Sequence, residues 1–591
     1  MRRNIFYIAV IFMFSAQVFA APEDKGFETT TKELAKSKGC LSCHEGIEEF
    51  PSWHILPELK GKRGKDCTGC HLGNPEATAK SEAHKGMYAN PSDLRVIDKT
   101  CGQCHSGKDS VKVRGETHHV DRVLISPMAN NPGGIAGALF SNDFTDDRLI
   151  NYTLSLKGVK DEKGNELKPL PPSDTHLSIE MERKSCLKCH LWAAGDKKPL
   201  FYRSSGCAAC HMPTADDATY QGGDPTVKGK LGYSKVHAIT TKIPSSQCVR
   251  CHKGGNRIGV SYTGELKGHI PDVHYEKGMH CIDCHLSKEI MGDGNIHIKK
   301  WQAVEIRCES CHGTPDSPPT IKGIRGTPIP NIEKEGDKYI LTSKYDGLKH
   351  IIPTLNFLKE KNLMPVQMAI PEHIKKLECY ACHAVKQVNC YGCHFEVDRT
   401  KMGKDLLTGE ESPGAWKMAE NFATKWKDTV LGINHRGKVA PFQLGCAVNF
   451  TEIDKDGKKI KDFFAFNKKG IPSYVRASAQ PHTIQRRGMR GCSDCHNSNY
   501  VMGLGGSETE KYPSGRQFII DPDRMADEKG NPQLIFSQPN QGALTGEVIE
   551  DMRKVGKCVR CHEKEKAEFW IKFDEHYEWA EKNKDAHKAK W

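Results

Sequence analysis

Residues 379–394 read Cys-Tyr-Ala-Cys-His-Ala-Val-Lys-Gln-Val-Asn-Cys-Tyr-Gly-Cys-His, so the pattern Cys-x-x-Cys-His occurs twice in close succession. The chain carries twelve copies, which contain 24 of its 25 cysteines. Two thiols at this spacing lie on one side of a turn, where they can add to the two vinyl groups of one haem, and the adjacent His can bind the iron. Half of a zinc site or a redox dithiol would explain a lone Cys-x-x-Cys, but neither needs the His. The repeated pattern therefore predicts twelve covalently attached c-type haems.

We number the motifs 1 to 12 in chain order. The predicted covalent attachment residues are Cys40 and Cys43, Cys67 and Cys70, Cys101 and Cys104, Cys186 and Cys189, Cys207 and Cys210, Cys248 and Cys251, Cys281 and Cys284, Cys308 and Cys311, Cys379 and Cys382, Cys390 and Cys393, Cys492 and Cys495, and Cys558 and Cys561. The predicted proximal iron ligands are His44, His71, His105, His190, His211, His252, His285, His312, His383, His394, His496 and His562.

The remaining histidines are numerous enough to give every iron a second ligand. The chain has 28 His, and several of those outside the motifs stand at a regular distance before one. His176 and His482, for example, each precede a motif by ten residues. We expect a His, a helix of about three turns, capped in the first case by Ser173 or Asp174, and then the motif, with the leading His reaching a neighbouring haem. The distal candidates are His54, His84, His118, His119, His176, His237, His269, His274, His280, His297, His350, His373, His435 and His482; His576 and His587, in the charged tail, are left out.

The composition predicts an unusual fold class. Only 37% of residues are hydrophobic, and the chain holds 54 Gly and 31 Pro, so the polypeptide alone cannot bury much apolar surface, whereas each porphyrin offers two broad apolar faces. We expect a mostly α and irregular, haem-packed fold with short helices, a few small β-hairpins and little regular core. Hairpins are expected at 149–167 and 439–466, and one amphipathic helix in the tail at 563–591. Without haem the chain should be largely unfolded.

The spacing of the motifs divides the chain. We expect a signal peptide at 1–20, a three-haem module at 21–135, a five-haem module at 136–330, a two-haem module at 331–400, and a C-terminal two-haem module at 401–591 with a β-rich insertion and a terminal helix. Residues 1–20 have two arginines, an apolar run and a small-residue cleavage site, as export signals do; an uncleaved membrane anchor is the alternative. The protein is therefore predicted to be exported, to the periplasm, the outer-membrane surface or the cell exterior.

The net charge of +12 suggests nucleic-acid binding at first sight. Twelve haems would add two propionates each, which makes the holoprotein near neutral or acidic, so no nucleic-acid partner is expected. The odd cysteine, Cys446, lies in a predicted strand and is interpreted as a small buried residue.

From residue 40 to 562 the chain resembles the large multihaem c-type cytochromes of anaerobic bacteria that respire metals or sulfur and nitrogen compounds. The resemblance rests on the repeated His and Cys-x-x-Cys-His units, the close pair at 379–394, and the segment from His482 to Gly505. It implies an electron carrier with bis-His haems, redox partners such as quinol-linked or periplasmic cytochromes or an outer-membrane conduit, and self-association as a homo-oligomer or filament. The alternative is a reductase or oxidase of a small nitrogen or sulfur species with one open haem, lined by residues such as Tyr380, Arg486 and Arg487; no Cys-x-x-Cys-Lys motif supports it.

Overall fold

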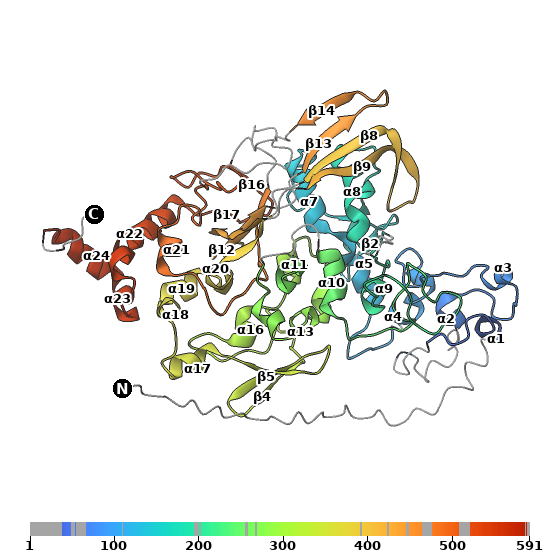
Figure 1. The fold of residues 1–591 in the computed structure, drawn as a ribbon, viewed down its shortest axis with the longest axis horizontal. Helices are drawn as coiled ribbons and strands as arrows, with labels where there is room; N and C mark the ends of the chain where they lie inside the picture. Colours follow the sequence, from blue (N-terminus) through green and yellow to red (C-terminus); the bar gives the residue numbers. More distant parts are fainter. Residues whose placement is uncertain are drawn as a thin grey trace, which may run out of the picture.

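The computed structural model describes residues 38–48, 54, 67–108, 110–193, 199, 202–253, 258–265, 269–389, 393–421, 425–444, 448–463, 475–506, 521–585 and 587. The helices that carry the motifs follow one another along the longest axis of the molecule, from the blue end to the red end in Figure 1. They are α1 (Lys38–Leu41), α2 (Cys67–His71), α4 (Gly102–His105), η3 (Cys186–Cys189), α9 (Ala208–His211), α10 (Ser245–His252), α13 (Cys281–Cys284), α16 (Cys308–His312), α20 (Cys379–His383), α21 (Cys492–His496) and α22 (Gly546–His562).

The other helices are also short, as the many Gly and Pro residues lead one to expect. They are α3 (Lys80–Ala83), η2 (Ile97–Lys99), α5 (His119–Ile125), α6 (Pro127–Asn130), α7 (Pro132–Ser141), α8 (Leu177–Lys184), α11 (Ile258–Thr263), α12 (Val273–Glu276), α14 (Ser287–Met291), α15 (Lys300–Ala303), α17 (Leu355–Glu360), α18 (Val366–Ala369), α19 (Pro371–Lys376), α23 (Ala567–Ile571) and α24 (Phe573–Lys582).

The prediction of a mostly α and irregular fold is wrong, because the structure is 32% helical and 18% strand and contains several sheets. One three-stranded sheet has the strand order β1 (Tyr152–Thr153), β3 (Glu166–Pro169), β2 (Val159–Lys160). A second has the order β4 (Ile332–Glu335), β5 (Lys338–Thr342), β6 (Lys349–Ile352). A third pairs β7 (Lys386–Asn389) with β10 (Lys425–Asp428). The four-stranded sheet has the strand order β14 (Lys459–Phe463), β13 (Val448–Ile453), β8 (Cys393–Lys404), β9 (Glu411–Asn421). The five-stranded sheet has the order β16 (Ile535–Phe536), β15 (Val475–Ser478), β12 (Val439–Leu444), β11 (Val430–Ile433), β17 (Gly542–Ala543).

One of the sheets is nearly closed into a barrel, and the edge strands of the five-stranded sheet identify it as this one. Its edge strands β16 and β17 are separated by only a short loop in sequence, yet they stand at opposite edges, so the sheet must curl to bring them near each other. Phe442, Val430 and Leu431 are buried in it. Three of the four pairings in this sheet join strands that are distant in sequence, and one of them, β15 with β16, is parallel. In the four-stranded sheet β13 also pairs in parallel with the distant strand β8. Local turn signals do not indicate such pairings, which is why the sequence underestimates the strand content.

The expected hairpins are partly confirmed. Strands β2 and β3 form an antiparallel pair, and β13 and β14 form another around Gly457, whose φ of 80° suits the turn. Residues 439–450, however, are two strands in two different sheets rather than one. The single tail helix is also replaced by two short helices, α23 and α24.

The expected helix before each motif is shorter than predicted. Helix α8 has only 8 residues, and its N-cap is His176 rather than Ser173 or Asp174, because the His176 side chain accepts a hydrogen bond from the amide of Ser178. Helix α15, between His297 and motif 8, has only 4 residues. The three-turn helix is therefore not the repeated unit of this fold.

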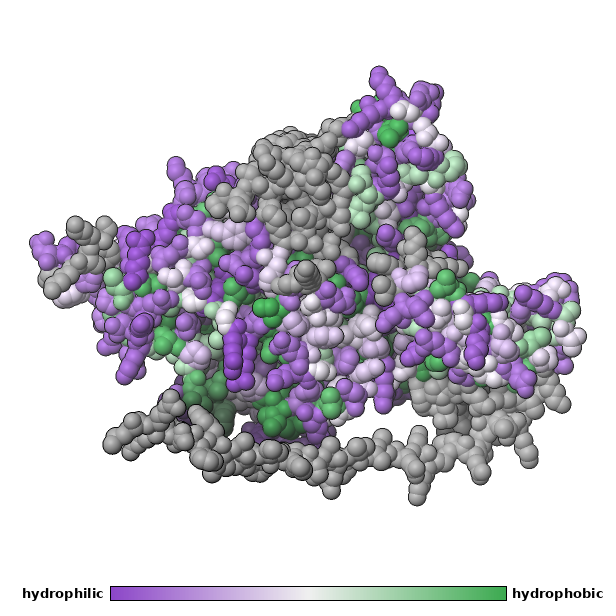
Figure 2. Space-filling view, in the orientation of Figure 1, coloured by the Kyte–Doolittle hydropathy of each residue, from purple (hydrophilic) through white to green (hydrophobic). Residues whose placement is uncertain are grey.

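The apolar core is divided into small clusters, most of which border on motif cysteines. Cys101 and Cys207 pack against one cluster, which α5, α7 and α8 help to form. Cys284 and Cys311 pack against a second cluster below the sheet β4–β6, and Cys495 against a third. Hydrophilic residues dominate the face shown in Figure 2. Apolar material is thus concentrated where haem would be attached. Within the ranges given above, no helix is long and apolar enough to cross a membrane.

Candidate haem sites

Eleven of the motifs contain or adjoin a helix, which is short except for the 17-residue α22 of motif 12. A helical turn can place both cysteines of a motif on the same side, as attachment to one haem would need. In motif 3 the amide of His105 donates to the carbonyl of Cys101 at 2.9 Å, and motifs 1, 5 and 7 show the same closure. Motif 10 differs, because Cys393 and His394 begin the strand β8. Cys390 of this motif, Cys446 and the segment 1–20 lie outside the described residues.

The ring Nδ1 of seven motif histidines is held by a hydrogen bond. The acceptors are backbone carbonyls for His71 (Tyr88, 2.8 Å), His211 (Thr240, 2.9 Å), His312 (Pro353, 2.7 Å), His383 (Gln485, 3.2 Å) and His496 (Met552, 3.0 Å), and carboxylates for His44 (Asp224, 2.7 Å) and His285 (Glu289, 2.8 Å). A proton fixed on Nδ1 leaves Nε2 as the metal-binding nitrogen, and partners of this kind orient metal-binding histidines in general. These seven rings are therefore set up as ligands.

Seven motif histidines also face a second histidine at the spacing of a bis-imidazole metal site. The distances between ring centroids are 6.2 Å for His44–His84, 5.7 Å for His71–His237, 6.1 Å for His105–His54, 6.2 Å for His285–His482, 6.2 Å for His312–His274, 6.3 Å for His496–His373 and 6.0 Å for His562–His587. A metal–imidazole bond is about 2.0 Å long and the ring centre lies about 1 Å further, so two ligands of one metal have centroids about 6 Å apart. The measured spacings match this value.

Six of these seven partners are predicted distal ligands: His54, His84, His237, His274, His373 and His482. A further one, His119, lies 5.7 Å from His105, so two candidates converge on motif 3. The partners come from remote parts of the chain: His237 precedes motif 6 but faces motif 2, and His482 precedes motif 11 but faces motif 7. The expectation that a leading His reaches a different motif agrees with this arrangement.

The other predicted distal ligands lie as follows. His269 stacks on Trp426 at 4.7 Å and His435 on Trp301 at 4.4 Å, whereas His176 lies 5.2 Å from Phe144 and His280 4.2 Å from Tyr345. Nδ1 of His118 is 3.3 Å from Asp121, Nε2 of His297 is 3.0 Å from Asp293, and His350 lies in β6. For these seven residues, as for the paired ones, ligation stays a prediction.

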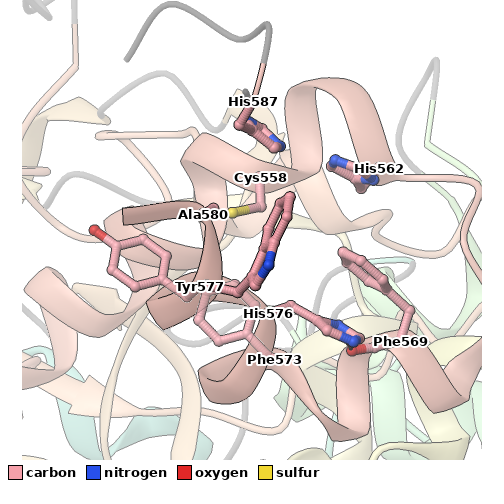
Figure 3. A pocket seen from close by; sticks show the side chains of 9 residues that line it. Cys558, His562, Phe569, Phe573, His576, Tyr577, Ala580 and His587 are labelled. Carbon is pink, nitrogen blue, oxygen red and sulfur yellow. Dashed lines mark hydrogen bonds between the residues drawn. The ribbon is translucent and has the colours of Figure 1, made fainter. Parts of the chain in front are cut away.

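At motif 12 the structure places next to the motif histidine a residue that the sequence analysis left out of the ligand candidates. His587 faces His562 across a cavity of about 240 Å³ that is lined mainly by aromatic side chains (Figure 3). Phe569 stacks on His562 at 4.9 Å and on His576 at 4.5 Å. A cavity with an apolar wall, a motif cysteine and two opposed imidazoles fits a haem. The aromatic residues of the tail were the available signal.

Burial favours the uncharged form of some of the candidate ligands. It lowers the pKa of His190 to about 4, and it is also the largest cause of the lowered pKa of His482, to about 4. A histidine must be neutral to bind a metal, so desolvation favours the ligating form at neutral pH. At His285 burial also acts to lower the pKa, but the hydrogen bond and charge of Glu289 outweigh it and the net pKa is raised.

Motif 10 is again distinct, because Nε2 of His394 lies 2.7 Å from the hydroxyl of Thr451 on β13. Of the residues named for an open substrate site, Tyr380 is buried at the centre of an apolar cluster with a raised pKa, first because of burial, while Arg486 and Arg487 are exposed. One buried tyrosine and two exposed arginines do not form a common lining for a substrate site.

In the part of the chain that the structure describes, no group of three or more His, Cys, Asp and Glu is arranged to hold a bare metal ion. No protein-family model, curated protein or solved structure matches this chain.

Proposed function

We propose that the chain is an exported electron-transfer protein that holds up to twelve covalent c-type haems, most of them with two histidine ligands. The observation that carries the proposal is the set of seven histidine pairs at 5.7–6.3 Å, each with a motif histidine as one member. Haem supplies reversible one-electron chemistry at iron.

The residues of the chain have three tasks in this proposal. The motif cysteines attach the group and fix its orientation. The carbonyls and carboxylates bound to Nδ1, such as Tyr88 and Asp224, set the tautomer of the proximal ring. The second histidine of each pair would bind the same iron, which would keep water and small substrates away from it. A site closed in this way favours electron transfer over substrate chemistry.

The test combines intact-mass spectrometry with electron paramagnetic resonance of the oxidised holoprotein, purified from an anaerobic host with a haem-attachment system. We expect the mass of the polypeptide without its first 20 residues plus twelve haems, with low-spin signals for the seven paired sites. Absence of covalent haem, or high-spin signals from most sites, would contradict the proposal. Binding of nitrite or hydroxylamine to a native high-spin haem would favour a reductase.

A further inference from the structure

The first and last motifs differ in one property from the other motifs whose cysteine side chains the structure describes. Among the motif cysteines that the structure describes, Cys43 of motif 1 and Cys561 of motif 12 are exposed, whereas the others are partly buried. Helices α1 and α22, which belong to these motifs, lie toward opposite ends of the long axis in Figure 1. The thioether edge of a bound haem would therefore be open to solvent at these two places.

Between these ends, neighbouring motifs touch one another. The sulfurs of Cys248 and Cys281 are in hydrogen-bonding contact, which joins motifs 6 and 7, and the amide of Cys281 donates to the Ser245 hydroxyl at 3.2 Å. The sulfurs of Cys308 and Cys379 join motifs 8 and 9 in the same way. Motifs 7 and 8 meet at the cluster that both Cys284 and Cys311 border.

The contacts continue to the C-terminal end. Arg490 donates through its backbone amide to the carbonyl of Cys382 at 3.2 Å, and its side chain reaches Cys495, so it lies between motifs 9 and 11. Helix α22 then packs closely on α21, with Nδ1 of His496 3.0 Å from the carbonyl of Met552. Motifs 9, 11 and 12 are consecutive in space.

Near the N-terminal end, the segment 237–240 connects motifs 1, 2 and 5. The backbone amide of His237 donates to the carboxylate of Glu48 at 2.8 Å, and Glu48 follows motif 1. The His237 ring faces His71 of motif 2. The carbonyl of Thr240 accepts from His211 of motif 5. Gln247 on α10 then donates to the carbonyl of Ala209 at 2.7 Å, which joins motifs 5 and 6.

Two motifs lie to one side of this row. Arg203 donates to the sulfur of Cys189 at 3.2 Å and to the carbonyl of Arg250 at 3.1 Å, which ties motif 4 to motif 6. Cys186 of motif 4 in turn packs against the cluster of Phe395 and Phe450, next to His394 of motif 10. Motifs 4 and 10 therefore branch from the middle, toward the sheet that contains β8 and β13.

We propose that motifs 1, 2, 5, 6, 7, 8, 9, 11 and 12 form one row along the molecule, with motifs 4 and 10 as a side branch. Motifs 1 and 12 are the two solvent-facing ends of this row, and electrons are exchanged with redox partners at these ends. The proposal rests on the proposed function, since it requires the sites to hold haem. It goes further by assigning the two docking regions and the order of the sites between them.

The test uses a ruthenium tris-bipyridine photoreductant tethered to an introduced cysteine in the holoprotein. Glu45→Cys and Glu563→Cys place it at exposed residues directly after His44 and His562, and Asp456→Cys places it at the exposed tip of the β13–β14 hairpin. Asn449 on β13 lies opposite His394 of motif 10. The control position, Asp456, is seven residues further along the chain, or about 20 Å from Asn449 if the chain is extended. We expect flash-induced haem reduction from both ends to exceed that from the control by an order of magnitude. Equal rates from all three would overturn the proposal.

A second measurement does not depend on labelling. Replacing Cys558 and Cys561 by Ala removes the haem of an end site, and replacing Cys281 and Cys284 by Ala removes one from the middle. In redox titrations the end deletion should shift the potential of one remaining haem and the middle deletion those of two, because a middle site has two neighbours. Two shifted neighbours after the end deletion would overturn the order. Intact mass separates this result from a failure of the proposed function, which would leave no covalent haem at all.

Discussion

The carboxylate behind His44 should hold the reduction potential of motif 1 low. Oδ2 of Asp224 lies 2.7 Å from Nδ1 of His44, and the Asp224 side chain is only 2% exposed. The pKa of Asp224 is lowered: burial acts to raise it, but the hydrogen bonds from His44 and Thr226 outweigh that effect. The group is therefore ionised at neutral pH. A fixed negative charge stabilises ferric over ferrous iron, because the ferric site carries one more positive charge.

The size of the effect follows from the geometry. Adding the imidazole ring and a metal–nitrogen bond to the 2.7 Å contact puts the carboxylate about 7 Å from the iron. At an effective dielectric constant of about 20, one unit charge at this distance contributes about 2 kcal/mol. For one electron, about 59 mV corresponds to a tenfold change in the equilibrium constant, so the full charge is equivalent to about 100 mV. Since His44 is 30% exposed, we expect Asp224→Asn to raise the potential of motif 1 by about 50 to 100 mV.

Spectroelectrochemical titration of the holoprotein measures this shift. The component that belongs to motif 1 is identified by its loss in a variant with Cys40 and Cys43 replaced by Ala. The Asn side chain keeps a hydrogen-bond acceptor for Nδ1, so the variant changes charge more than position. An unchanged titration curve, or a shift to lower potential, would refute the reasoning. Glu289→Gln provides the parallel case at motif 7, where the carboxylate lies 2.8 Å from His285.

Three further outcomes are expected. His373→Ala should convert one haem, that of motif 11, to high spin without loss of covalent haem, as read by electron paramagnetic resonance and intact mass; an all-low-spin spectrum would remove His373 as a ligand. Gly556→Ala should lower the free energy of unfolding by about 1–3 kcal/mol, because a Cβ would clash with the carbonyl oxygen of His496. Gly542→Ala, with nothing within 4 Å, is the control in thermal melting, and equal effects would contradict the packing argument. Burial raises the pKa of Glu182 from 4.5 to about 7. The stability associated with its protonated form is therefore complete below about pH 4.5 and is lost as the pH rises toward 7. Glu182→Gln should make the melting temperature depend less on pH between pH 5 and pH 8, and an unchanged pH dependence would exclude Glu182 as the cause of it.

The attachment sites could be predicted from the sequence because their signature is local and chemical, whereas the pairing of ligands could not. His237 faces motif 2 and His482 faces motif 7 through contacts between remote segments, which spacing along the chain does not encode. His587 was left out of the candidates because it lies in a charged tail, whereas the structure places it with Phe569 and Trp579 in the lining of the cavity at motif 12. The strand content was underestimated for a related reason, since β8 pairs in parallel with β13, far along the chain.

The partners of the ring nitrogens also suggest how the sites differ in potential. Carboxylates lie behind His285 of motif 7 and behind His274, which faces His312 of motif 8; Glu289 and Asp272 are each 2% exposed on their side chains. A backbone carbonyl instead lies behind His211 and His496, on either side of this pair in the proposed row. A charged partner favours the ferric state more strongly than a neutral one. Motifs 7 and 8 are adjacent at a shared cluster, and we expect their haems to have lower reduction potentials than the haems on either side of them in the row. Electrons would then reside mainly on the haems of the two halves of the molecule that flank this pair.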